Sequence, residues 1–170
     1  MRTTSHRPDV NGVLDQWRPV AQYFLDEYEK AAAREARIEN EKQQFMRLSE
    51  HQEQQNNREI ADSLVDVGIP RYQILEALDS MTDSERLAQF REYANAARAQ
   101  RVECDQILND LRAGNCETAT GYLLLRSSLL EERAKTIALR SPGSPMVIRF
   151  GPQNESERSR VEQCLALLQK

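Results

Sequence analysis

Apolar residues in this chain recur three and four positions apart over most of its length, and this spacing restricts it to helices that bury one stripe of side chains. The first stripe consists of Val13, Leu14, Trp17, Ala21, Phe24, Leu25 and Tyr28. Aromatic residues make up only 6% of the chain and charged residues 29%, which does not favour one large spherical core. The sequence therefore predicts an all-α fold of long helices that bury one face and expose the rest.

Residues 13–57 are predicted to form one long, charged amphipathic helix, preceded by a flexible arm at residues 1–12. Its main part should begin near Arg18, after a lead-in turn or short helix, because Pro19 suits the first turn of a helix. From residue 29 onward the segment is rich in Ala, Glu, Arg, Lys and Gln, which are strong helix formers. A weak heptad seam follows from three apolar positions seven residues apart: Ala31, Ile38 and Phe45.

Residues 58–95 are predicted to form a compact unit of three short helices. Gly68 and Pro70 interrupt its apolar runs, and Thr82 to Glu85 matches a capping box. Residues 96–140 should then form a helical pair. Gly114 is expected to end the first helix of this pair, and Asn115 is a plausible cap for the second.

The C-terminal part of the chain begins with a break rich in Pro and Gly. Residues 141–153 are predicted to be a linker in which 146–150 is extended, as the best strand candidate in the chain. A short C-terminal helix is expected over residues 154–170. Asn154 and Glu157 would form its capping box.

Composition excludes several classes of partner. The chain carries 23 Lys and Arg against 27 Asp and Glu, a formal net charge of −4, and it has no basic block. Phosphate contacts dominate nucleic-acid affinity and anionic lipid attracts a basic face, so neither nucleic acid nor a membrane surface is an expected partner. No run approaches the roughly 20 apolar residues of a membrane span. Three cysteines without framework spacing favour a reducing, cytoplasmic setting.

The residues that carry catalysis or bind cofactors are not arranged in any recognisable motif. His6 and His51 lie in polar stretches away from the cysteines. Cys104, Cys116 and Cys164 lack metal-ligand spacing, so they are interpreted as small buried apolar residues. Glycine-rich phosphate loops and nucleophile motifs are absent from the sequence. We therefore expect no catalytic residue, no metal and no cofactor, and the chain is predicted not to be an enzyme.

The segment from Ile60 to Leu78 resembles the ubiquitin-associated (UBA) domain, a unit of three short helices. Val67, Gly68 and Ile69 stand where that family has an apolar-Gly-apolar turn, and an Ala-Leu pair at 77–78 ends the second helix. The run Glu85-Arg-Leu87-Ala-Gln-Phe90 stands where the third helix would lie. The resemblance implies a surface that docks ubiquitin or a ubiquitin-like fold. Its protein-binding residues would be Val67, Gly68, Ile69, Leu87 and Phe90.

Two functions stay open from the sequence. The chain could be an adaptor that binds ubiquitin or a similar fold through the 67–69 turn. Alternatively, it could be a structural subunit or assembly chaperone of a cytoskeletal or secretion complex, with no ubiquitin binding. In that case the stripes at residues 17–28 and 119–137 would pack on partner helices, and the Val67 turn would be buried. Either function makes other proteins the partners, and association into homo- or hetero-oligomers stays open.

Overall fold

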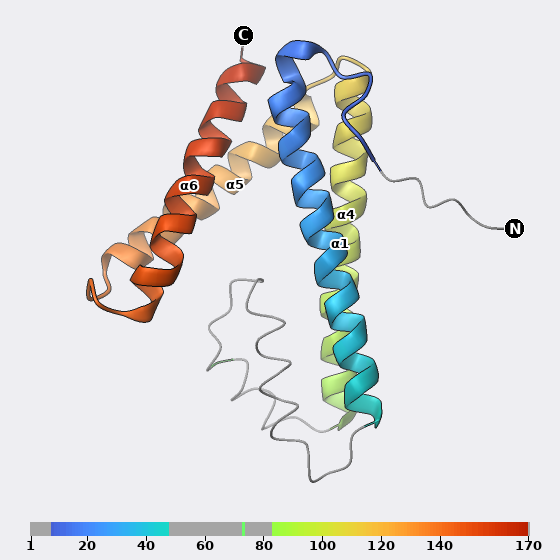
Figure 1. The fold of residues 1–170 in the computed structure, drawn as a ribbon, viewed down its shortest axis with the longest axis vertical. Coiled ribbons are helices and arrows are strands. Elements are labelled where there is room, and N and C mark those ends of the chain that lie inside the picture. The colour runs from blue at the N-terminus through green and yellow to red at the C-terminus, as the bar shows by residue number, and fades with distance from the viewer. Residues whose placement is uncertain (1–7, 48–72, 74–82, 170) are drawn as a thin grey trace, which may run out of the picture. The chain divides into compact units, whose positions relative to one another are not determined.

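A computed structural model describes residues 8–47, 73 and 83–169 of the chain. Within these residues every regular element is a helix and none is a strand, which confirms the all-α prediction. The chain divides into two compact units, one made of Met1–Leu25 with Asp105–Lys170 and the other of Asp26–Cys104. Each unit is described separately below. Figure 1 shows α1 beside α4, and α5 beside α6.

The beginning of α1 follows the sequence prediction. A short 3-10 helix, η1 (Asp15–Trp17), leads directly into α1 (Arg18–Arg47). Pro19 occupies the second position of α1, where a missing N–H costs nothing because no helical acceptor precedes it. Arg47 is the last residue that the structure places in this helix, so the predicted extension to residue 57 lies outside the described residues.

Residues 8–12, which belong to the predicted flexible arm, contact the end of α4. The Arg112 guanidinium donates to the backbone carbonyls of Asp9 and Asn11, the latter at 2.9 Å, and it also pairs with the Asp9 carboxylate. Gly12 turns the chain with a φ of 83°, a conformation that glycine adopts without strain. Residues 8–12 of the predicted arm thus contact α4 through Arg112, while residues 1–7 lie outside the described part of the chain.

In the Asp26–Cys104 unit, the second part of α1 packs along the first part of α4 (Asp83–Arg112). Ala31 and Ile38 of the predicted heptad seam are buried, and the Phe45 ring lies 5.8 Å from that of Phe90. On α4, Ala94 and Ala97 are buried, and such small side chains let two helices approach closely. The predicted seam is therefore confirmed as buried at Ala31 and Ile38, while Phe45 is partly buried.

The same unit carries a polar layer beside its apolar seam. Glu27 is buried and accepts hydrogen bonds from Gln100 of α4 and from Lys30. Arg98 and Arg101 both pair with Glu35 at 3.1 Å. These charges remain partly solvated, so the pairs orient the helices more than they stabilise them.

The predicted boundary at residue 95 does not exist, because α4 runs without a break from Asp83 to Arg112. Its buried side continues at helical spacing through Phe90, Ala97, Cys104 and Leu111. No glycine or proline interrupts this stretch, and alanines around residue 95 are strong helix formers. The third helix expected of the UBA-like unit is thus the start of a longer helix. The other two expected helices, except for Gln73, lie outside the described residues.

Gly114 ends α4 as predicted, with a φ of 80°. Helix α5 (Glu117–Ala138) follows directly. The Asn115 side chain accepts the backbone N–H of Glu117 at 3.0 Å, which satisfies one of the donors at the start of α5. The division of residues 96–140 at Gly114 is therefore confirmed.

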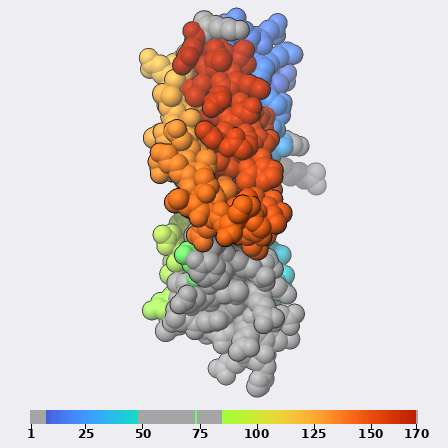
Figure 2. All heavy atoms as spheres, turned by 90° about the vertical axis from the view of Figure 1, so that its left-hand side faces the viewer, coloured from blue at the N-terminus to red at the C-terminus, as the bar shows by residue number. Residues whose placement is uncertain are grey.

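In the other unit, which contains Asp105–Lys170, helix α6 (Pro145–Leu168) packs against α5. Figure 2 shows the two helices side by side on the surface of that unit. Leu123 and Leu130 of α5, and Val161 and Cys164 of α6, are buried. A salt bridge from Arg126 to Glu157, 2.7 Å long, joins the helices at the edge of this interface.

The predicted extended segment at 146–150 and the capping box at Asn154 are both wrong. Residues 146–150 lie in the first turns of α6, which is capped by Ser144, whose hydroxyl accepts the backbone N–H of Val147 at 3.4 Å. Asn154 lies inside this helix, buried, and donates to the Leu130 carbonyl of α5 at 3.1 Å. Packing against α5 overrides the β propensity of this short apolar run.

Candidate protein-binding surface

Helix α5 is apolar on more than the face that it buries. From Thr118 to Leu130 its only charged residue is Arg126, and the side chain of Arg126 is bound to Glu157 of α6. A surface helix normally carries one apolar stripe and a charged opposite face. Because α5 lacks the charged face over this stretch, its solvent side is a candidate binding surface.

The inward side of α5 is occupied within its own unit. Ala119, Leu123 and Leu130 are fully buried, and the Tyr122 ring contacts Phe24 of α1 edge-on at 5.1 Å. These positions belong to the stripe at residues 119–137 that the structural-subunit alternative assigned to partner helices. The structure uses that stripe for packing between the chain's own helices.

The outward side of α5 exposes three leucines. Leu124 is 52% exposed, Leu125 is 72% exposed and Leu129 is 56% exposed. Leu125 and Leu129 lie one turn apart, and Gly121 precedes Leu125 by one turn, so these residues share one side of the helix. Ser128 lies between them and is also exposed. We call Gly121, Leu124, Leu125, Ser128 and Leu129 the α5 outer face.

Gly121 is unexplained by the packing of its own unit. Apart from its chain neighbours and the backbone of its own helical turns, a Cβ atom at this position would meet no atom within 4 Å, and the residue does not have a positive φ. A glycine inside a helix costs about 1 kcal/mol relative to alanine. Its presence here leaves a gap, or notch, in the row of outer side chains one turn before Leu125.

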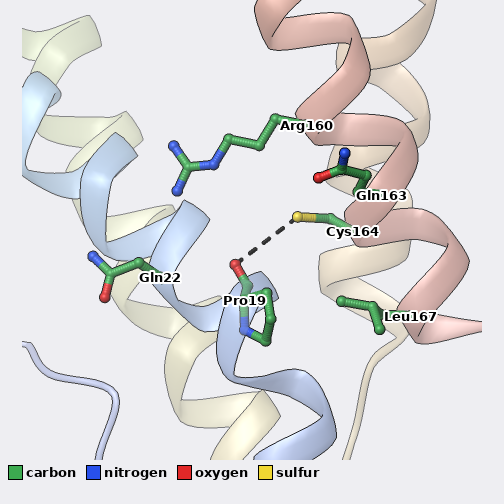
Figure 3. A pocket seen from close by; sticks show the side chains of 6 residues that line it. All are labelled: Pro19, Gln22, Arg160, Gln163, Cys164 and Leu167. Atoms are coloured by element: carbon green, nitrogen blue, oxygen red, sulfur yellow. Dashed lines mark hydrogen bonds between the residues drawn. The ribbon is translucent and has the colours of Figure 1, made fainter.

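A shallow hollow of about 340 Å³ lies between the first turns of α1 and the C-terminal half of α6 (Figure 3). Pro19, Gln22, Arg160, Gln163, Cys164 and Leu167 line it. The Cys164 thiol lies 3.9 Å from the Pro19 carbonyl oxygen, to which it donates. Arg160 lies over the Tyr23 ring, with 5.2 Å between the guanidinium carbon and the ring centre. The hollow is open and has no converging set of polar groups, so it is a poor small-molecule site.

Two of the three cysteines are buried thiols. The pKa of Cys104 is raised to about 12, chiefly by burial and also by the nearby negative charges of Glu27 and Glu103. Burial also raises the pKa of the Cys164 thiol, although Arg160 opposes this shift. Because the thiolate is the reactive form, both thiols are held in their unreactive state at neutral pH. This agrees with the interpretation of Cys104 and Cys164 as small buried apolar residues.

The five predicted binding residues are not brought together on a surface that the structure describes. Val67, Gly68 and Ile69 lie outside the described residues. Phe90 is 2% exposed because it packs on α1 at Phe45, and Leu87 is half-buried. A partner could therefore reach Phe90 only if α1 and α4 separated in that unit.

Sequence reasoning missed the α5 outer face, although a signal for it was present. The run Tyr122-Leu-Leu-Leu125 followed by Leu129-Leu130 holds more apolar residues than one helical stripe can bury. The periodic positions were assigned correctly to a single stripe. The leucines outside that stripe are the ones left exposed.

Two further findings concern the described ranges alone. None of their helices is long and apolar enough to cross a membrane. No group of three or more His, Cys, Asp or Glu side chains in these ranges is placed to hold a metal ion. Comparison of the chain with protein-family models, curated proteins and solved structures found no match.

Proposed function

We propose that this chain is a non-catalytic helical protein that works by binding other proteins, with the α5 outer face as its docking surface. The observation that carries this proposal is the exposure of Leu124, Leu125 and Leu129 on a side of α5 without charge. Contiguous exposed apolar residues mark interaction sites, because water-exposed apolar surface is a source of free energy for association. A helix face of this kind fits an apolar helix of a partner.

The proposal covers both functions that the sequence left open. An adaptor and a structural subunit would both bind through an apolar helix face. They differ in the lifetime of the contact, since a structural subunit keeps its face covered and an adaptor exchanges partners. The uncharged character of the face favours a lasting contact, because obligate interfaces are more apolar than transient ones.

Site-specific photo-crosslinking tests this function. A photoreactive amino acid would replace Leu125 in the full chain, produced in its source cells, and the matched control would replace Glu162, which is exposed on α6. We expect discrete covalent adducts of higher mass from position 125 and only background from position 162. Equal background at both positions would contradict the proposal. Mass spectrometry of the adduct identifies what occupies the face.

The UBA-like unit at residues 58–95 supports a second candidate function, binding of ubiquitin through Val67, Gly68 and Ile69. It is supported by the sequence resemblance, whereas the burial of Phe90 speaks against the expected patch. The test is an NMR titration of isotope-labelled ubiquitin with the unlabelled full chain and with its Ile69→Asp variant. Saturable shifts that disappear with the variant are expected if this site binds. An unperturbed ubiquitin spectrum at near-saturating chain would remove this function and leave the α5 proposal unaffected.

A further inference from the structure

The α5 outer face has the features of a self-complementary surface. An interface with two-fold symmetry brings the same patch of two copies together, so each feature must meet its complement at the mirrored distance from the axis. For two antiparallel helices, residues before the central position on one copy face residues after it on the other. The sequence of α5 can therefore be checked against a centre at Leu125, the most exposed of its leucines.

The first complementary pair is a notch and a side chain. Gly121 lies one turn before Leu125, and its missing side chain opens on solvent, with nothing within 4 Å of where a Cβ would be. Leu129 lies one turn after Leu125 and is 56% exposed. In an antiparallel pair centred on Leu125, Leu129 of each copy lies opposite Gly121 of the other, which fills both notches at once. This gives the helical Gly121 a role that its own unit does not supply.

The second complementary pair is electrostatic. Glu117, in the first turn of α5, and Lys135, in its last turn, bound the uncharged stretch. They lie on the same side of the helix because they are about five turns apart at about 3.6 residues per turn. Glu117 lies eight residues before Leu125 and Lys135 ten residues after it. Antiparallel pairing centred on Leu125 therefore brings Glu117 of one copy to within about 3 Å, measured along the helix axis, of the level of Lys135 of the other, an offset that these two long side chains can span. Lys135 also pairs with Glu132 of its own helix at 3.3 Å, but both side chains are largely exposed, so that pair can rearrange at little cost.

From these observations we propose that the α5 outer face binds a second copy of this chain, with the two α5 helices antiparallel and their two-fold axis beside Leu125. This inference rests on the proposed function, since it names the partner of the same surface. The contact is centred on uncharged residues, so its affinity comes from apolar burial, while the Glu117–Lys135 pairs select the antiparallel orientation.

Analytical ultracentrifugation of the full chain over a concentration series tests this assignment. The monomer has a mass of 19.6 kDa, and we expect the average mass to approach twice that value as concentration rises. Leu125→Glu should weaken the dimer at least about tenfold, because it buries a charge in the centre of the contact. The matched control is Val102→Glu, which makes the same change at a side chain of α4 that is 58% exposed, and it should leave the mass unchanged.

A charge exchange tests the orientation. Glu117→Lys alone and Lys135→Glu alone should each weaken the dimer, and the combination of both changes should restore it, since the pairs are re-formed with reversed signs. The restoration also controls for the role of Glu117 at the helix N-terminus, where an acidic residue stabilises α5 itself. Circular dichroism of each variant verifies that it is folded.

A disulfide tests the axis. Leu125→Cys in a Cys116→Ser background should form a disulfide-linked dimer under mild oxidation, because a two-fold axis beside residue 125 brings the two new thiols together. A chain that stays monomeric at all concentrations would overturn the inference. A dimer whose dissociation constant is unchanged by Leu125→Glu would also overturn it. If position 125 still crosslinks to a different protein, the proposed function stands and only its occupant is wrong. If position 125 crosslinks to nothing, both the proposed function and the dimer inference fail.

Discussion

Single polar residues inside the helix seams specify how the helices pair. Asn154 is buried on α6 and donates to the Leu130 carbonyl, while its own side-chain oxygen has no hydrogen-bond partner among the residues that the structure describes. Such a residue reduces stability, since an unsatisfied buried polar atom costs about 1–3 kcal/mol. In return, Asn154 fixes the register of α6 on α5, because shifting one helix along the other would break the hydrogen bond from its amide to the Leu130 carbonyl. Glu27, bound to Gln100, is placed comparably in the other unit.

The buried Cys104 thiol predicts a pH dependence of stability. Its pKa rises from 9.0 to about 12 on folding, chiefly through burial. Between these values the folded chain holds a proton that the unfolded chain has lost, so the free energy of unfolding should decrease as pH rises from about 9 toward about 12. Urea unfolding of Cys104→Ala and of the unchanged chain, at about pH 8 and about pH 10.5, measures this contribution.

The expected result is a smaller alkaline loss of stability for Cys104→Ala than for the unchanged chain. Other groups titrate in the same range, so the difference between the two chains carries the information. Cys116→Ala is the control, because Cys116 is only partly buried. Equal alkaline losses in all three chains would show that the Cys104 thiol does not contribute.

At the scale of the elements, helix ends decide what short apolar runs become. Residues 146–150 have a composition suited to a strand, but Ser144 and Pro145 form a favourable helix start immediately before them. From Val147 to Leu168 the less exposed residues of α6 recur at regular helical spacing, so they all lie on one side of the helix. Pro152 lies inside this helix on an exposed side, where water can reach the carbonyl of Ile148, which loses its helical N–H donor.

The N-cap of α6 can be tested by substitution. Ser144→Ala should lower the free energy of unfolding by about 1 kcal/mol, because the Val147 N–H loses its side-chain acceptor. Ser141→Ala makes the same change three residues earlier, outside the helix, and should have an effect below about 0.5 kcal/mol. Urea unfolding followed by the fluorescence of Trp17, the only tryptophan, reports both. Equal effects of the two substitutions would mean that Ser144 is not the cap.

At the scale of the whole molecule, two compact units share the long helices α1 and α4. Each unit buries its own stripes, and the apolar surface left over within the described residues is concentrated on α5. Three of the eight large apolar side chains that are exposed there lie on the α5 outer face. The other five lie apart from one another, near η1, on α1, α4 and α6, and at the end of α5, and single exposed apolar residues of this kind are ordinary.

The sequence by itself determined the helical class, the start of α1 at Arg18, the buried heptad of Ala31 and Ile38, and the end of α4 at Gly114. These features depend on local propensity and on periodicity, which are properties of neighbouring residues. It did not determine that α4 continues through residue 95, because the absence of a glycine or proline permits a longer helix without requiring one.

Only the tertiary structure decided which apolar residues are available to a partner. Periodicity assigns side chains to a face of a helix, but it does not say how many faces the rest of the chain will cover. Phe90 fits a binding patch by its position in the sequence but is buried against Phe45, whereas Leu125 has no predicted role and is exposed. The physical reason is that burial depends on contacts between residues far apart in sequence, such as Tyr122 with Phe24, which no local pattern contains.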